Sequence, residues 1–338
     1  MQLAESASSS VGHRDMLPVA PLISVIIPTR GRPHLVLRAL RSVLGQTYDT
    51  FEVLVIIDGP DSATADHIAS IPDSRIRVIR LPESVGGSEA RNVGIRASAG
   101  EWVALLDDDD EWLPEKLQHQ VAEAQRYAGP YVFVATRYIS RGTKGDTVEP
   151  QCLPKPTQAI SEYLFCTVPL LGYRKGFLQT STWLVSTQLM LEVPFTKGLQ
   201  RNQDTDWLLR ASNKKDLTIA VLTDVLSIFY NDTDRVRISK TNDWRYSLEW
   251  AINNREIFTP KALSYFIATI STHNAAKLGE PSTVLWSLLA NCRQYGRLTP
   301  GVLWFFARNA FLFPWARRFS QWSTELRSIA VGQRGAQL

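Results

Sequence analysis

Several apolar segments of this chain end abruptly at polar or acidic residues, and this pattern restricts the fold more than any other feature. The segments are residues 22–27, 51–57, 76–81 and 102–106, and they are rich in Val, Ile and Leu. Short runs of this kind are typical of strands that are buried on both faces of a parallel sheet. The last of them runs directly into four consecutive aspartates.

Helical spacing separates these runs. Leu37, Leu40 and either Val43 or Leu44 recur at intervals of three to four residues and mark the buried face of a first helix, and a second helix is expected over residues 63–71. The alternation of strand and helix predicts an α/β fold with a Rossmann-like, mostly parallel central sheet and helices on both faces. Ligands of such sheets bind beyond the carboxyl ends of the strands. The turns after the first, second and fourth strands are therefore expected to share one site.

The four consecutive acids, residues 107–110, are the first candidate for that site. Adjacent carboxylates repel one another unless a positive charge binds between them. Hard cations such as Mg²⁺ prefer carboxylate oxygens and often share their coordination with phosphate, which indicates a metal–diphosphate site. A solvated acidic turn in front of a helix over residues 114–128 explains the acids equally well. On these residues alone both interpretations stay open.

The composition and the absence of certain motifs exclude several classes of binding site. The chain has neither GxGxxG nor GxxxxGK[ST], so a dinucleotide-binding site and a P-loop are not expected. With 338 residues, 44% of them hydrophobic, it can form one α/β domain plus a smaller helical appendage. Three distant cysteines predict no disulfide framework and favour a reducing compartment, and the five scattered histidines form no zinc motif. Residues 1–20 are expected to be a disordered leader, and no segment is expected to span a membrane.

The basic charge is concentrated at the carboxyl end. The formal net charge is +4, and residues 281–338 hold seven arginines, no lysine and one acid, Glu325. The pattern over residues 241–338 is helical and rich in Trp and Phe. Such a region suits the headgroup layer of an anionic membrane, or it buries its aromatic rings on the rest of the protein or in a dimer. No nucleic-acid partner is expected.

Five motifs, taken together and in order, resemble family-2 glycosyltransferases of the GT-A fold. They are residues 24–29 (SVIIPT), 52–59 (EVLVIIDG), 86–92 (GGSEARN), 100–110 (GEWVALLDDDD) and 112–117 (WLPEKL). The resemblance covers about residues 22–232. It implies a GT-A catalytic domain over residues 21–240, with a nucleotide-sugar half to about residue 115 and an acceptor half from about residue 116. A helical C-terminal extension over residues 241–338 would follow.

For the donor, the resemblance implies a nucleotide diphosphate sugar at the strand ends. Asp58 would recognise the base, Pro28 and Thr29 would shape its pocket, and Asp108 would lie near the ribose or sugar. Arg91 would reach the diphosphate or the acidic cluster, although an ordinary structural ion pair is an alternative for this residue. The implied nucleotide-sugar-binding residues are Pro28, Thr29, Arg30, Asp58, Arg91, Asp107 and Asp108.

For the metal, the resemblance assigns Asp107 and Asp109 as the two acids of a DxD motif that holds Mg²⁺ or Mn²⁺, with Asp109 the first choice as direct ligand. The metal would neutralise charge on the departing diphosphate. The sequence departs from the common family pattern in two places, because Ile57 replaces the first acid of an Asp-Asp-Gly turn and Asp108 adds a charge inside the DxD motif.

A second acidic segment, residues 202–206 (NQDTD), resembles the family's Glu-Asp-x-Asp segment, whose second acid is the catalytic base. That position is Asp204, while Gln203 replaces the first acid. A carboxylate can accept the proton of the acceptor hydroxyl as its oxygen attacks the anomeric carbon. Direct displacement of this kind would invert the anomeric configuration. A helix N-cap is the alternative interpretation of Asp204.

The implied function is an inverting glycosyltransferase that moves a sugar from a nucleotide diphosphate sugar to a hydroxyl of a glycan or lipid-linked acceptor, in cell-surface polysaccharide or glycolipid synthesis. A cytoplasmic location is expected, with peripheral contact at the inner face of the plasma membrane as an option. The alternatives are a non-catalytic carbohydrate-binding or scaffold protein with this fold, and a nucleotidyltransferase. Weaker candidates for ligand contact are Tyr173, Arg174 and Trp183 for a sugar, and Arg235 or Arg237 for the diphosphate.

Overall fold

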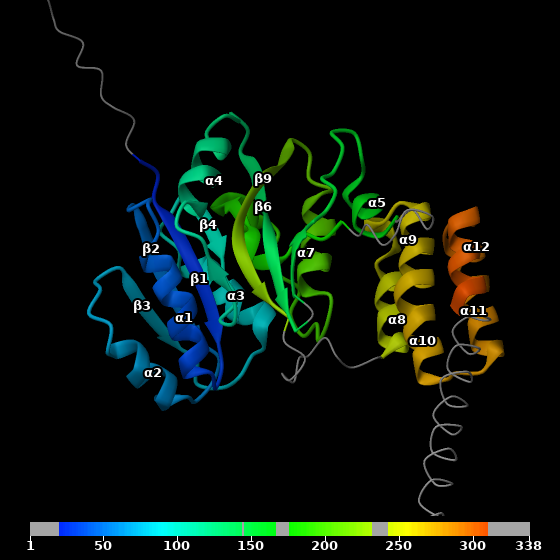
Figure 1. Ribbon diagram of the computed structural model, residues 1–338, viewed down its shortest axis with the longest axis horizontal. Coiled ribbons are helices and arrows are strands. Elements are labelled where there is room, and N and C mark those ends of the chain that lie inside the picture. The colour runs from blue at the N-terminus through cyan, green and yellow to red at the C-terminus, as the bar shows by residue number, and fades with distance from the viewer. Residues whose placement is uncertain (1–19, 144, 167–175, 232–242, 310–338) are drawn as a thin grey trace, which may run out of the picture.

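The computed structural model describes residues 20–143, 145–166, 176–231 and 243–309 (Figure 1). Its strands are β1 (Ile23–Thr29), β2 (Phe51–Ile57), β3 (Ile76–Arg80), β4 (Trp102–Leu105), β5 (Glu111–Trp112), β6 (Tyr131–Gly142), β7 (Gly145–Glu149), β8 (Leu184–Ser186) and β9 (Leu217–Tyr230). Within the described residues they form one sheet in the order β3-β2-β1-β4-β8-β6-β9-β5, with β7 beside β6.

Helices connect and cover these strands. They are α1 (Pro33–Leu44), α2 (Ser62–Ala69), α3 (Gly87–Ala97), α4 (Lys116–Ala124), α5 (Ile160–Phe165), α6 (Thr187–Glu192), α7 (Gln203–Ala211), α8 (Trp244–Asn253), α9 (Pro260–Phe266), α10 (Thr272–Leu278), α11 (Ser282–Tyr295) and α12 (Pro300–Ala307). A 3₁₀ turn, η2 (Thr180–Thr182), precedes β8, another, η4 (Arg255–Ile257), follows α8, and a π-helical turn, η5 (Ile267–Ser271), joins α9 to α10.

The first half of the sheet is parallel, as the sequence predicts. β1 pairs in parallel with β2 on one side and with β4 on the other, and β2 pairs in parallel with β3. The second half is mixed, because β8 runs antiparallel to both β4 and β6, whereas β6 and β9 are parallel. The carboxyl ends of β1, β2 and β4 therefore lie along one edge, where the polar turns follow.

Alternation along the strands gives the sheet an apolar surface on each face. Ile23, Val25 and Ile27 of β1 pack on the side covered by α1, α2 and α4. Ile26 packs on the opposite side with α3, α6 and α7. All four side chains are fully buried. Helices on both faces of the sheet confirm the expected layers.

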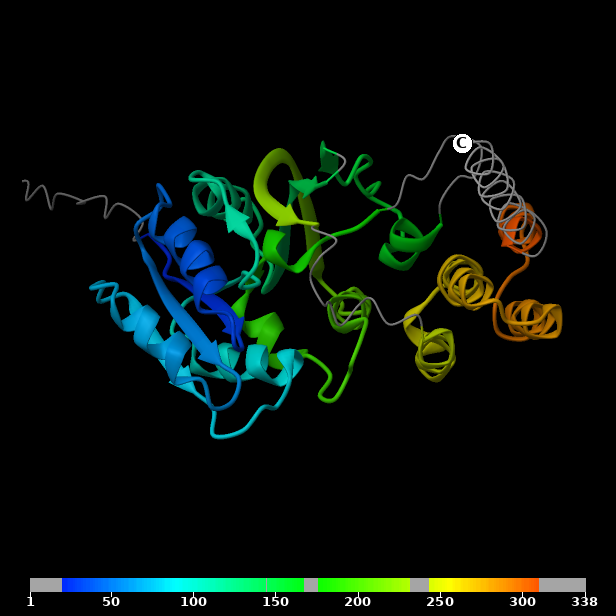
Figure 2. The same cartoon turned by 60° about the horizontal axis from the view of Figure 1, so that its bottom comes forward.

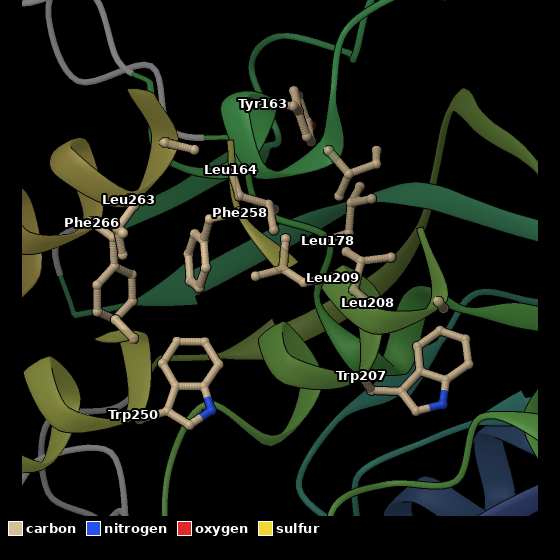
Figure 3. Close-up of a cluster of buried hydrophobic side chains, with 14 of the residues drawn as sticks. Tyr163, Leu164, Leu178, Trp207, Leu208, Leu209, Trp250, Phe258, Leu263 and Phe266 are labelled. Carbon is tan, nitrogen blue, oxygen red and sulfur yellow. The ribbon is translucent and has the colours of Figure 1, made fainter. Parts of the chain in front are cut away.

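The helices that follow β9 pack beside α5 and α7 and share the core of the sheet domain (Figures 2 and 3). Trp250, Phe258 and Phe266 belong to the same apolar cluster as Leu164 of α5 and Trp207 of α7. Polar contacts cross the same boundary, since Lys261 donates to Glu162 at 2.7 Å. Among the described residues, no helix is both long and apolar enough to span a membrane.

Individual aromatic residues of the tail differ in exposure. Phe305 and Phe306 are buried, whereas Trp286 is 63% exposed and Trp304 is 42% exposed. Trp183, a weak candidate for sugar contact, is fully buried against Phe133, Phe195 and Trp207, so its contact with a sugar is excluded. Residues 1–19, Tyr173, Arg174, Arg235 and Arg237 lie outside the described residues.

Candidate active site

The four-acid turn begins where β4 ends, beside the carboxyl end of β1. Leu105 pairs with Ile26 in the parallel register, and the amide of Leu106 donates to the carbonyl of Ile26 at 3.1 Å. The amide of Asp110 donates to the carbonyl of Asp107 at 3.1 Å, which closes the turn. The acids therefore lie at the strand-end edge, as the sequence predicts.

Asp107 and Asp109 face a cavity of about 420 Å³, which is within the usual range for a small-molecule site. The cavity is also lined by Arg32, by Arg91 and by Asp204 in the first turn of α7. The structure thus brings together acids and arginines from distant parts of the chain. Both acidic segments that the sequence singles out contribute to this one cavity.

Asp108 does not line the cavity and is 5% exposed. Its carboxylate accepts hydrogen bonds from the hydroxyl of Thr29 at 2.8 Å and from Nη1 of Arg32 at 3.0 Å. Burial raises the pKa of Asp108 to about 6, against the opposing effects of the Arg32 charge and the Thr29 hydroxyl. Asp108 therefore ties the acidic turn to the end of β1.

Asp110 is also buried, at 1% exposure. Its Oδ2 accepts from Nε2 of Gln179 at 2.6 Å and from the hydroxyl of Ser181 at 2.7 Å. Burial raises the pKa of Asp110 well above its ordinary value, and the charges of Asp107 and Asp109 add to this effect. Sequence reasoning missed Gln179 and Ser181, because no motif marks the 3₁₀ turn η2 or the residue before it.

Arg91 joins the two acidic segments. From α3, its Nη2 donates to Oδ1 of Asp107 at 2.5 Å, and its Nη1 donates to Oε1 of Gln203 at 3.1 Å. A Cβ atom at Gly87 would lie 3.2 Å from both Arg91 Nη1 and Gln203 Oε1, so glycine leaves room for this contact. Arg91 forms the ion pair that the sequence left as an alternative, and it also lines the cavity.

Asp204 is the second residue of α7, and the N-cap of that helix is Asn202. The N-cap interpretation of Asp204 is therefore wrong. Burial raises the pKa of Asp204, the charge of Asp107 adds to this effect, and the charge of Arg91 and a hydrogen bond from the hydroxyl of Thr180 oppose it. A raised pKa strengthens a carboxylate as a proton acceptor near neutral pH.

At the end of β2, Asp58 is buried and organises the loop before α3. Its carboxylate accepts from the hydroxyl of Ser84 at 2.9 Å and from the amides of Val85 at 2.6 Å and Gly86 at 3.1 Å. Nη1 of Arg30 also donates to Ser84 at 2.9 Å. Five expected binding residues are absent from the cavity lining, namely Pro28, Thr29, Arg30, Asp58 and Asp108. Their roles in nucleotide-sugar binding stay predictions.

The donor set at the cavity suits a hard divalent cation. Among the described residues there is no group of three or more His, Cys, Asp or Glu side chains arranged to hold a metal ion. Mg²⁺ is commonly held by one or two carboxylates together with substrate phosphates and water, so Asp107 and Asp109 fit such an ion in the presence of a diphosphate. Metal binding by these residues stays a prediction.

Comparison with known families agrees with the geometry. The family model described as "Glycosyl transferase family 2" matches residues 24–175, which include the acidic turn and Arg91. The chain contains a glycosyl transferase family 2 domain. Asp204 lies beyond the matched residues, so its assignment rests on the cavity and on the motif at residues 202–206.

Curated relatives of this chain are also named as glycosyltransferases. The chain is 28% identical over 256 residues to the amylovoran biosynthesis glycosyltransferase AmsB of Erwinia amylovora, covering 71% of this chain and 81% of the relative. It is 31% identical over 193 residues to the putative colanic acid biosynthesis glycosyl transferase WcaA of Escherichia coli K12, covering 56% of this chain and 66% of the relative. The protein is accordingly a glycosyltransferase.

A solved structure supports the fold. The crystal structure of S. aureus TarS 1-349 in complex with UDP-GlcNAc aligns with a TM-score of 0.52 and 20% sequence identity, covering 85% of this chain and 81% of the TarS 1-349 chain. The sheet and its covering helices therefore have the GT-A fold that the sequence predicts, and C-terminal helices follow them.

Proposed function

We propose that this glycosyltransferase is a metal-dependent, inverting enzyme that transfers a sugar from a nucleotide diphosphate sugar to a hydroxyl group of a glycan or lipid-linked acceptor. The observation that carries the proposal is the single cavity lined by Asp107, Asp109, Arg91 and Asp204. The names of the relatives AmsB and WcaA, which refer to amylovoran and colanic acid biosynthesis, support a role in cell-surface polysaccharide or glycolipid synthesis.

Each group of residues that lines the cavity would have its own part in the reaction. Asp107 and Asp109 would hold Mg²⁺ or Mn²⁺, which when bound supplies Lewis-acid stabilisation of the diphosphate charge. Arg91 and Arg32 place positive charge beside these acids, since Arg91 pairs with Asp107 and Arg32 lies 3.8 Å from Asp109, and this charge would attract the diphosphate. In this arrangement the donor would lie along the acidic turn, with its anomeric carbon directed toward Asp204 of α7.

Asp204, in the first turn of α7, would act as the general base. It accepts the proton of the acceptor hydroxyl while that oxygen forms a bond to the anomeric carbon. The bond between the anomeric carbon and the diphosphate oxygen breaks, and the nucleoside diphosphate leaves with the bonding electrons. One displacement without a covalent intermediate inverts the anomeric configuration. General-base catalysis of this kind typically contributes about 10²–10⁴-fold in rate.

A panel of UDP-, GDP- and dTDP-sugars tests the proposal. We expect release of the nucleoside diphosphate from one class of donor in the presence of Mg²⁺ or Mn²⁺, and loss of that release with EDTA. The anomeric proton coupling of the product, measured by NMR, reports inversion. Donor binding without turnover under any of these conditions would instead support the non-catalytic carbohydrate-binding alternative.

We also propose peripheral contact of the C-terminal helices with an anionic membrane at the cytoplasmic face. The exposed Trp286 and Trp304 and the arginine-rich carboxyl end support it. Truncation before α8 would uncover the shared core, so a Trp286→Ser/Trp304→Ser variant is the better test. We expect weaker sedimentation of this variant with phosphatidylglycerol vesicles, and equal sedimentation would contradict membrane contact.

A further inference from the structure

A second cavity, of about 240 Å³, lies between the sheet domain and the C-terminal helices. Leu164 and Phe165 of α5 form one wall, and Phe266 and Ile270 of the α9–η5 segment form another. Leu164 and Phe266 face this boundary from different helices in Figure 3. Because the walls are mainly aliphatic and aromatic, the cavity suits a small non-polar group.

This second cavity adjoins the first. Phe177, Asn202 and Thr205 line both of them. Thr205 directly follows Asp204, and Phe177 is 38% exposed although it is a large apolar residue. A molecule that presents a hydroxyl to Asp204 can therefore extend a non-polar group into the second cavity.

Asn202 lies where the two cavities meet, and its side-chain amide has a hydrogen-bond donor without a partner among the described residues. Its backbone is left-handed, with φ of 61°, and its side chain makes no capping hydrogen bond to α7. Its Nδ2 atom is buried and has no hydrogen-bond partner within the described part of the chain. A buried donor without a partner costs free energy unless a ligand satisfies it.

The helix on the far wall is irregular at the cavity. Thr269 and Ile270, which line it, belong to the π-helical turn η5. Such turns are rare and frequently occur at functional sites. The hydroxyl of Thr269 donates to the carbonyl of Tyr265 at 2.7 Å, so this polar wall residue is satisfied and leaves the cavity largely apolar.

We propose that the second cavity binds a non-polar aglycone of the acceptor, and that Nδ2 of Asn202 donates to an acceptor oxygen between the two cavities. The acceptor class is a glycoside whose aglycone is aliphatic or aromatic. This inference rests on the proposed transfer reaction, since it places the accepting hydroxyl at Asp204. Asn202 is a positioning residue in this arrangement.

Binding of paired alkyl glycosides tests the cavity. The probes are methyl and n-butyl glycosides of glucose, galactose and N-acetylglucosamine, titrated by calorimetry in the presence of UDP and Mn²⁺. We expect at least one butyl glycoside to bind on the order of tenfold more tightly than its methyl counterpart, since added CH₂ groups gain free energy on burial. Equal affinities in all three pairs would overturn the proposal.

Substitutions in and outside the second cavity test whether the preference for butyl glycosides arises there. Ile270→Trp should fill the cavity and remove the preference for butyl over methyl, whereas Leu278→Trp, at an exposed position of α10 outside the cavity, should keep it. Asn202→Gly keeps the left-handed backbone and removes the amide, so it should weaken both glycosides by a similar factor. A preference that survives in Ile270→Trp would contradict the assignment.

Separate readouts distinguish this inference from the proposed function. UDP binding and nucleoside diphosphate release are measured in the same proteins. Failure of release in the wild-type protein would count against the transfer reaction, whereas normal release with no butyl preference would count against the second cavity alone.

Discussion

The turn at residues 107–110 and the first two turns of α7 each hold carboxylates of two kinds. Asp107, Asp109 and Asp204 line the cavity. Asp108, Asp110 and Asp206 are buried, with hydrogen-bond donors from neighbouring elements. Each acidic motif therefore contains carboxylates that line the cavity, which are the candidates for metal binding and catalysis, and buried carboxylates that hold neighbouring elements together.

The largest expected effect is a loss of turnover on replacement of Asp204, the acid of α7 that lines the cavity. Asp204→Asn removes the proton acceptor but keeps the shape of the side chain, so we expect turnover to fall by about 10²–10⁴-fold. Steady-state kinetics with the active donor measures this. Donor affinity and melting temperature serve as controls, and turnover equal to the wild-type value would contradict the assignment.

The buried acid of the same helix should behave in the opposite way. Asp206 accepts from Thr196 at 2.7 Å, from Arg210 at 2.9 Å and from Nε1 of Trp250 at 3.2 Å. Asp206→Ala leaves these donors without their acceptor, so we expect the free energy of unfolding to fall by about 3 kcal/mol. Urea denaturation measures the loss, and unchanged stability together with lost turnover would place Asp206 in the chemistry instead.

A smaller effect is expected on the pH profile. Burial raises the pKa of Asp204, and only its ionised form accepts a proton. The value of kcat/KM should therefore fall about tenfold for each pH unit below that pKa. The pH at which this fall begins should lie above the ordinary aspartate pKa of about 3.9. A profile that stays flat through the ordinary aspartate range would show that another group is the base.

The sequence predicted the parallel half of the sheet well, because its signals are local. The run at residues 51–57 matches β2, and the run ending at Leu106 matches β4 within one residue. It could not place β8 between β4 and β6, since a three-residue strand carries little pattern and its pairing is long-range. It singled out Asp107, Asp109, Arg91 and Asp204, which line one cavity, but it did not predict that Asp108 is buried outside the cavity lining.

Long-range contacts also explain why the sequence did not reveal some of the residues around the cavity. Gln179 and Ser181 hold Asp110 from 69 and 71 positions away along the chain. Asn202 is a candidate for ligand contact because it lines both cavities, which the sequence does not reveal. Such contacts depend on tertiary packing rather than on spacing in the sequence.

Calorimetry of donor binding with and without Mn²⁺ tests the central claim most directly. The proteins are the wild type, Asp109→Asn and, as a matched control, Asp66→Asn at an exposed position of α2. We predict that Mn²⁺ strengthens donor binding at least about tenfold in the wild type and in Asp66→Asn, but not in Asp109→Asn. Equal strengthening in all three proteins would contradict the assignment of the acidic turn as the metal–diphosphate site.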